Sequence, residues 1–259
     1  MATSSGVPPR IRALQRHLRG VRARLGWVLL SSGVGASLTW YFRDTIFVWL
    51  YAPARRHLSD DWQPIFTGPT EMLGLAIQLA MWGGLVVAFP VFMYHVLRFF
   101  WPVLGRSQRR FLAFCLPVVL LCYLAGAAFA YFVMLPTSMG FLLKFGTGIA
   151  IPLIRITEYM DLVMMLIFWL GVVFELPLIM VALTKLRVVR FRRFWQWNKY
   201  VPVFASILSA VITPTLDVVN MAFVAIPIVG LYQIGLICAF LVKGRDGARP
   251  GSRPLSQRH

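Results

Sequence analysis

Six apolar runs constrain this 259-residue chain more than any other feature. A helix needs about 20 mostly apolar residues to cross the hydrocarbon core of a bilayer. Hydrophobic residues make up 59% of the chain and charged residues 14%, whereas a soluble domain has about 45–50% and about 25%. We therefore predict an all-α membrane protein with spans at Leu25–Phe42, Met72–Phe100, Phe111–Leu135, Met160–Leu183, Val201–Ile212 and Met221–Val242.

The distribution of charge gives these spans an orientation. The chain has 26 Lys and Arg residues against 9 Asp and Glu residues, a formal net charge of +17. A nucleic-acid-binding domain carries such cations over a polar folded surface, whereas here they lie between apolar runs. With a cytoplasmic N-terminus, 21 cations fall on cytoplasmic segments and five outside, namely Arg43, Arg55, Arg56, Lys144 and Arg155. Because basic residues are retained on the cytoplasmic side, this distribution predicts six spans with both termini cytoplasmic.

The segments outside the spans have their own character. Residues 1–24 form a basic arm with apolar residues at helical spacing, so we expect an amphipathic helix on the inner membrane surface and no cleaved signal peptide. Residues 25–242 form the membrane domain, whose outer loops, Arg43–Glu71 and Pro136–Tyr159, are long enough for short helices. Residues 243–259, rich in Gly, Pro, Ser and Arg, are expected to form a disordered cytoplasmic tail.

The residue types that carry catalysis or bind metals form no recognisable motif. Cys115, Cys122 and Cys238 lie in apolar runs, where a free Cys packs like a small hydrophobe. The four histidines are scattered, and the sequence has neither a phosphate-binding glycine loop nor a nucleophile elbow. We therefore expect no catalytic residues, no cofactor and no metal site.

Glu175 is the one acid within a predicted span, in the segment Gly171-Val-Val-Phe-Glu-Leu-Pro177. An ionisable group in lipid is costly and marks a functional site or a specific partner. Two interpretations are open: a polar contact with another membrane helix, or a structural role beside the backbone carbonyl that Pro177 frees. Prolines recur in or beside the spans, which predicts a kinked bundle with a concave groove. These prolines are Pro90, Pro117, Pro136, Pro177, Pro202, Pro214 and Pro227.

Several motifs occur together, in one order, along nearly the whole chain. They are His17-Leu18-Arg-Gly-Val-Arg22-Ala-Arg-Leu25, Pro90-Val-Phe-Met-Tyr94 with Arg109-Arg110, Gly126-Ala-Ala-Phe-Ala-Tyr131-Phe-Val-Met-Leu-Pro136, Phe174-Glu-Leu-Pro177 and Thr213-Pro-Thr-Leu-Asp217. Pro69, before the second span, belongs with them. Within a six-span plan, this set resembles the TatC family, the multispanning subunit of the twin-arginine protein translocase.

The resemblance implies a function and a set of partners. TatC subunits bind the paired arginines of signal peptides on folded cargo and recruit single-span TatA and TatB proteins, which open the membrane using the proton-motive force. It places the contacts with the signal peptide or a partner at Glu175, Arg22, Arg109, Arg110, Gln108 and Gly20. It also implies a multi-pass protein of the cytoplasmic membrane, surrounded by lipids and forming homo-oligomers within the translocase, with no nucleic acid bound.

The chain departs from the family pattern at three positions that would carry acids. Gly20 and Gln108 stand where the family has the carboxylates that grip the signal's guanidinium groups, a pairing suited to charge-assisted hydrogen bonds. Gln233 replaces a third acid near the end of the last span. An alternative is therefore a divergent paralogue that scaffolds TatA-type helices with weakened twin-arginine recognition. A small-solute transporter and a purely structural membrane anchor are further alternatives, although no internal repeat of spans supports the transporter.

Overall fold

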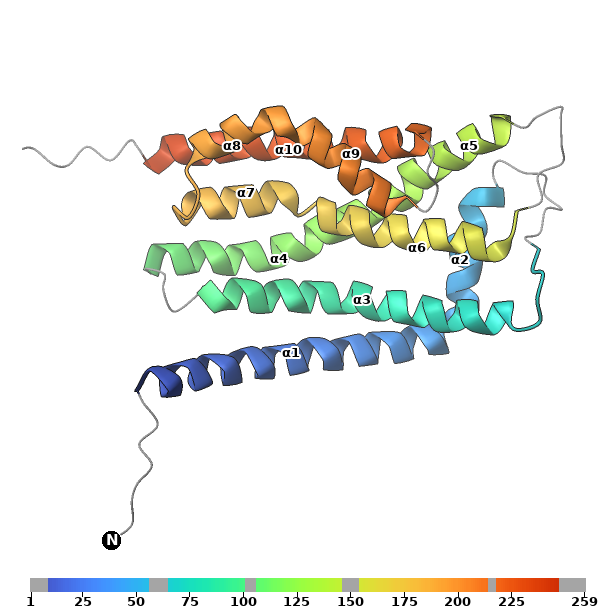
Figure 1. Ribbon diagram of the computed structural model, residues 1–259, viewed down its shortest axis with the longest axis horizontal. Helices are drawn as coiled ribbons and strands as arrows, with labels where there is room; N and C mark the ends of the chain where they lie inside the picture. Colours follow the sequence, from blue (N-terminus) through green and yellow to red (C-terminus); the bar gives the residue numbers. More distant parts are fainter. Residues whose placement is uncertain (1–8, 56–64, 101–105, 146–153, 214–217, 247–259) are drawn as a thin grey trace, which may run out of the picture. The chain divides into compact units, whose positions relative to one another are not determined.

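The computed structural model describes residues 9–55, 65–100, 106–145, 154–213 and 218–246. Helices make up nearly all of these ranges, which confirms the all-α prediction (Figure 1). They are α1 (Pro9–Tyr41), α2 (Arg43–Arg55), α3 (Glu71–Phe100), α4 (Arg106–Phe129), the π-helical turn η2 (Ala130–Met134), α5 (Leu135–Phe145), α6 (Ile156–Val173), α7 (Leu176–Lys185), α8 (Phe191–Trp197), the 3₁₀ turn η3 (Asn198–Tyr200), α9 (Val201–Ile212) and α10 (Val218–Asp246).

Four of the six predicted spans are long and apolar enough, among the described residues, to cross a membrane. These four stretches are Glu71–Arg98, Gln108–Phe141, Ile156–Lys185 and Val218–Val242. The short fifth run forms α9 with the predicted bounds, Val201–Ile212. The first segment predicted to be an outer loop contains a short helix, α2, whereas the helix in the second, α5, overlaps the end of the apolar stretch Gln108–Phe141.

The first predicted span is part of a longer helix. The helix α1 runs without a break from Pro9 to Tyr41, so no helix end marks the predicted boundary at residue 24. Arg and Leu are both good helix formers, and the change from basic to apolar composition therefore changes the surface of the helix without interrupting its backbone. At the other end, residues 243–246 continue α10, and the rest of the predicted tail lies outside the described residues.

One predicted kink is a true break. The chain leaves α6 at Val173, passes through Phe174 and Glu175, and enters α7, where Pro177 occupies the first turn. Proline is tolerated there because the first N–H groups of a helix have no partner within it. Pro136 likewise lies in the first turn of α5, directly after the π turn η2. Pro90, Pro117 and Pro227, by contrast, lie inside helices that continue past them.

The described chain divides into two compact units. Unit 1 comprises residues 1–103 and 135–168, and unit 2 comprises residues 104–134 and 169–259. In unit 1, α1 runs alongside α3 (Figure 1). A Cβ atom at Gly84 of α3 would lie 2.7 Å from the Ser32 carbonyl oxygen, and one at Gly35 of α1 would lie 2.7 Å from Val87 Cβ. Small residues on both helices therefore let the two backbones approach closely, as membrane helix pairs commonly do.

The start of α3 is fastened to the start of α6 by the carboxylate of Glu71. Its Oε2 accepts hydrogen bonds from the Thr67 and Gly68 backbone N–H groups, at 2.7 and 3.2 Å. Its Oε1 accepts one from the Thr157 hydroxyl and lies 3.5 Å from Arg155 Nη2. An isolated parallel β-bridge between Ile65 and Arg155 holds the two segments together. Glu71 is thus a structural acid, paired within its own unit.

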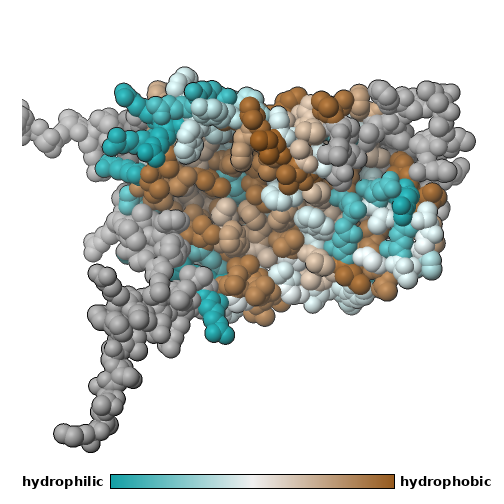
Figure 2. Space-filling model, viewed as in Figure 1, coloured by the Kyte–Doolittle hydropathy of each residue, from teal (hydrophilic) through white to brown (hydrophobic). Residues whose placement is uncertain are grey.

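Unit 2 is organised around α10, which packs against α7, α8 and α9. Its core includes Met180, Phe194 and Leu236, and the Tyr232 hydroxyl donates a 2.7 Å hydrogen bond to the Phe194 carbonyl. Apolar side chains also cover the outside of the helices. On α9, for example, Val203, Phe204, Ile207 and Val211 are all more than half exposed. Figure 2 shows hydrophobic residues (brown) spread over the helix surfaces, which is the expected exterior for helices in lipid.

Candidate functional site

Glu175 lies at the break between α6 and α7. Its backbone N–H donates to the Val172 carbonyl at 3.1 Å, and its carbonyl accepts from Ile179 N–H at 2.9 Å. The whole residue is 0% exposed. Neither carboxylate oxygen has a hydrogen-bond partner among the described residues. A carboxyl group in such a position is costly, because burial removes its contacts with water and nothing in the described structure replaces them.

On the α6 side of Glu175, the helices α4 and α6 cross closely. A Cβ atom at Gly126 would lie 2.5 Å from the Leu170 carbonyl oxygen, and one at Gly171 would lie 2.6 Å from the Tyr123 ring. Phe174 adds a ring contact with Phe129 of α4, with 5.4 Å between centroids. The α6 segment just before Glu175 is therefore packed tightly against α4.

On the α7 side of Glu175, the backbone packs against α10. A Cβ atom at Gly235 would lie 2.6 Å from Met180 Sδ and 3.0 Å from Pro177 Cα, so α10 contacts the first turns of α7 directly. With α4 on the preceding segment and α10 on the following one, the backbone on both sides of Glu175 is held by glycine-mediated contacts. The backbone at Glu175 is therefore held from both sides within unit 2.

This geometry bears on the two interpretations of Glu175. The structural interpretation requires a hydrogen bond between the carboxyl group and a backbone group that Pro177 frees. The described structure has no such bond, since both side-chain oxygens are without partners there. What the arrangement offers chemically is a hydrogen-bonding group held in an apolar bundle, which favours a polar contact with another chain.

The residues expected to contact the signal peptide fall in different units. Gly20 and Arg22 belong to α1 in unit 1, where the Arg22 side chain is exposed. Gln108, Arg109 and Arg110 lie in the first turns of α4 in unit 2; the first two are half-buried and Arg110 is exposed.

The other motif residues have mostly structural positions. Pro69 lies in the turn before α3, Pro90 lies inside α3, and Tyr131 lies in the π turn η2. His17 and Leu18 lie on α1. Asp217 falls outside the described residues.

Two polar pairs were not anticipated from the sequence. The Gln233 side-chain amide donates to Asn198 Oδ1 at 2.7 Å, which ties α10 to η3. In unit 1, the Gln78 amide donates to Asp161 Oδ1 at 2.5 Å. Each pair joins residues 35 or 83 positions apart in the sequence, and the one available signal was a lone amide within an apolar run.

The cysteines are free thiols, with Cys115 buried and Cys122 and Cys238 half-buried. Among the described residues, no three His, Cys, Asp or Glu side chains lie close enough together to hold a metal ion.

Comparison with known proteins identifies relatives along nearly the whole chain. Residues 16–227 match the family model described as "Sec-independent protein translocase protein (TatC)". The chain is 32% identical over 234 residues to the TatC of Koribacter versatilis, covering 89% of this chain and 86% of that protein. It is also 32% identical to the TatC of Aquifex aeolicus over 226 residues, covering 86% and 92%. A crystal structure described as the twin-arginine translocase receptor TatC superposes with a TM-score of 0.79 at 31% identity, covering 88% of this chain and 99% of that one.

Proposed function

The chain belongs to the TatC family of Sec-independent protein translocase subunits, and from this we propose that it binds signal peptides of folded proteins and recruits TatA- and TatB-type single-span partners. It is a membrane protein of protein transport, and its family is a translocase component with no catalytic chemistry of its own. The proton-motive force would then supply the work of transport.

We propose six spans with both termini cytoplasmic. The distribution of cations supports this topology, because 21 of the 26 then lie on cytoplasmic segments. The exposed apolar side chains of α1 and α9 support the two spans that are too short or too polar to be recognised by length and composition. Leu29, Leu30 and Val34 of α1, like Phe204 and Ile207 of α9, are more than half exposed. Such surfaces are stable only against lipid or another apolar helix.

Glu175 carries the proposal for partner recruitment. Its carboxyl group is buried and unpaired among the described residues, at a break that glycine contacts hold in place. Because Glu175 is 0% exposed in the isolated chain, neighbouring side chains would have to move before a polar group on an incoming membrane helix or signal peptide supplied the missing hydrogen bond. Homo-oligomerisation within the translocase could place that group on a second copy of the chain.

Signal recognition is proposed to be weaker or different in this chain. Gly20 has no side chain, and the neutral amide of Gln108 accepts a hydrogen bond without supplying charge. A charge-assisted hydrogen bond is about twice as strong as a neutral one, so two missing carboxylates weaken the grip on paired guanidinium groups. This is the observation that favours a divergent scaffold as the second candidate function.

Complementation of an export-defective strain, with a twin-arginine reporter, tests the proposal. We expect export by this chain when its TatA- and TatB-type partners are present, and stronger signal-peptide binding after Gly20→Glu with Gln108→Glu. Gln196→Glu, which introduces the same charge at an exposed position of α8, should leave binding unchanged. Failure of export together with rescue by the two restorations would support the scaffold. Substrate-dependent current in vesicles without any protein cargo would overturn both in favour of a transporter.

A further inference from the structure

A basic cavity lies at the end of α7, in unit 2. It has a volume of about 550 Å³, and its lining includes Lys185, Arg187, Arg190 and Arg192, together with Val242 of α10. Among the described residues, none of these four cations has an ion-pair partner. The sequence contains no acid between Glu175 and Asp217, and Asp246 is the only one after that. The cavity therefore concentrates positive charge with little of the chain's own negative charge to offset it.

Arg187 occupies a backbone conformation that favours glycine. Its φ is 59°, and it is the one non-glycine residue with a positive φ in the described ranges. It closes α7 in a Schellman turn, in which Val188 N–H donates to the Leu183 carbonyl at 3.0 Å and Arg187 N–H donates to the Thr184 carbonyl at 3.1 Å. Glycine is the usual residue at this position, since it has no Cβ to clash. Retaining Arg there has a conformational cost, which points to a use for the side chain.

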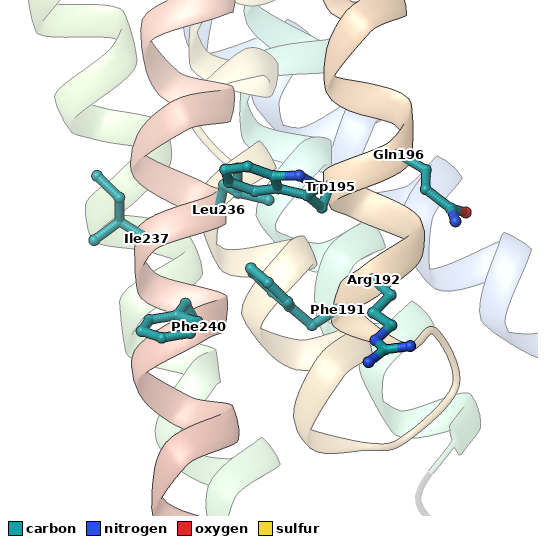
Figure 3. A pocket seen from close by; sticks show the side chains of 7 residues that line it. All are labelled: Phe191, Arg192, Trp195, Gln196, Leu236, Ile237 and Phe240. Atoms are coloured by element: carbon teal, nitrogen blue, oxygen red, sulfur yellow. The ribbon is translucent and has the colours of Figure 1, made fainter.

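An apolar groove adjoins the basic cavity and shares Phe191 and Arg192 with it. The groove has a volume of about 700 Å³ and runs between α8 and α10. Figure 3 shows Phe191 and Trp195 of α8 pointing toward α10, whose Leu236, Ile237 and Phe240 also line the groove. The rings of Phe191 and Phe240 lie 5.5 Å apart, whereas Trp195, Ile237 and Phe240 are more than half exposed.

We propose that the cavity and the groove together form a binding site for an anionic phospholipid. The phosphate of the headgroup lies among Lys185, Arg187, Arg190 and Arg192, and an acyl chain lies along the groove between α8 and α10. Basic pockets at the ends of membrane helices suit anionic headgroups, and guanidinium groups pair with phosphate through two parallel hydrogen bonds. A zwitterionic lipid would place the positively charged group of its headgroup beside these cations, and a soluble anion would leave the groove unused. The site shares no residue with those assigned to partner and signal binding.

Native mass spectrometry of the purified full chain in a neutral detergent tests this site. The probes are phosphatidylglycerol, phosphatidylcholine with the same acyl chains, and glycerol 3-phosphate. We expect phosphatidylglycerol to bind at least about tenfold more tightly than phosphatidylcholine, and glycerol 3-phosphate to compete poorly. Equal binding of the two lipids, or equal competition by glycerol 3-phosphate, would overturn the proposal.

Matched charge variants separate the cavity from general surface charge. Arg192→Gln should weaken phosphatidylglycerol binding by about fivefold, whereas Arg193→Gln removes the same charge one residue away and outside the cavity lining, and should change it less than twofold. Arg187→Gly should also weaken it by about fivefold without lowering the thermal unfolding midpoint, because glycine relieves the strained φ. Equal losses at Arg192 and Arg193, or unchanged binding in Arg187→Gly, would assign the effect to the surface as a whole.

Matched apolar variants test the groove. Phe240→Ala should weaken the binding of long-chain phosphatidylglycerol and reduce its dependence on acyl length. Phe204→Ala removes an equally exposed ring from α9, outside the groove, and should do neither. If Phe240→Ala left lipid binding unchanged and abolished co-purification of a single-span partner, the groove would hold a protein helix and the proposal would fail.

Discussion

Two glutamates at helix starts show how differently one side chain is used in the two units. Glu71, at the start of α3 in unit 1, accepts hydrogen bonds from backbone N–H groups and from two threonine hydroxyls, and it pairs with Arg155. Glu175, at the start of α7 in unit 2, is fully buried, and both its carboxylate oxygens lack partners among the described residues. Pro69 lies two residues before Glu71, and Pro177 lies two residues after Glu175.

The difference separates a structural acid from one available to another chain. Glu71 is satisfied by its own unit, so its contribution is complete in the isolated protein. Burial of the Glu175 carboxyl group is unfavourable, and no hydrogen bond from the described part of its unit offsets it; we propose that a polar group on a partner helix or signal peptide does so. The comparison makes opposite predictions for stability and export at the two positions.

The largest effect is expected for export in Glu175→Leu. Loss of the hydrogen-bonding group should lower export of a twin-arginine reporter by about tenfold or more, since truncating one partner of a buried polar contact typically costs about 2–5 kcal/mol of binding. The thermal unfolding midpoint should not fall, because Leu has a similar volume and leaves no unsatisfied group. Glu175→Gln, which retains a hydrogen-bonding side chain, should keep part of the export. Normal export in Glu175→Leu would contradict the proposed difference between Glu175, which is available to another chain, and Glu71, which is structural.

The opposite pattern is expected for Glu71→Ala. This substitution removes the hydrogen bonds from Thr67, Gly68 and Thr157 and the contact with Arg155. It should lower the unfolding midpoint by roughly 5 °C, as measured by thermal unfolding in detergent. Export should fall only as far as the amount of folded protein does. Glu158→Ala is the matched control, because Glu158 also pairs with Arg155, at 3.7 Å, but its side chain is 70% exposed. An equal loss in the two variants would show that the Glu71 carboxylate is not a structural anchor.

A smaller effect is expected when the packing of α4 against α6 beside Glu175 is loosened. In Gly126→Ala, the new Cβ would lie 2.5 Å from the Leu170 carbonyl, so α4 and α6 must separate. We expect a loss of about 1–3 kcal/mol in the free energy of unfolding, with a partial loss of export. Gly230→Ala on α10 meets nothing within 4 Å and should be neutral or slightly stabilising. Full export in a destabilised Gly126→Ala would indicate that the fixed position of Glu175 is unimportant.

The smallest effect is expected at Gln233, which stands where the family has an acid and whose amide forms a hydrogen bond within unit 2. Gln233→Leu removes the hydrogen bond to Asn198 and should lower the free energy of unfolding by about 1 kcal/mol. Chemical denaturation measures this change. Because Gln233 resembles Glu71 in being satisfied by its own unit, export should follow stability; a loss of export at unchanged stability would instead group it with Glu175.

Much of the fold followed from local patterns in the sequence. Apolar runs predicted the long spans, and Pro177 predicted a kink because a proline imposes its effect on its own helical turn. The predicted amphipathic arm and first span form one continuous helix, α1, because a change of helix surface is not a change of helix propensity. Pro90 and Pro227 show the reverse case, in which a local signal does not end the helix.

Only part of the candidate site could be predicted from the sequence. Glu175 stood out from its charge alone, since ionisable groups are rare in apolar runs. Its lack of a partner among the described residues depends on which groups α4 and α10 bring near it, and no local sequence pattern records that. The same holds for Glu71, whose partners Arg155 and Thr157 lie more than 80 residues along the chain. Pairings of this kind arise from tertiary packing and leave no periodic trace in the sequence.

Co-purification of a TatB-type single-span partner with Glu175→Leu tests the central claim most directly. Equal amounts of wild-type chain, Glu175→Leu and Glu71→Ala would be captured from detergent-solubilised membranes, and the bound partner quantified per folded chain. We predict that Glu175→Leu retains about a tenth of the partner or less, whereas Glu71→Ala retains the wild-type ratio. A wild-type ratio in Glu175→Leu would contradict the account, because Glu175 would then be a buried acid that no other chain requires.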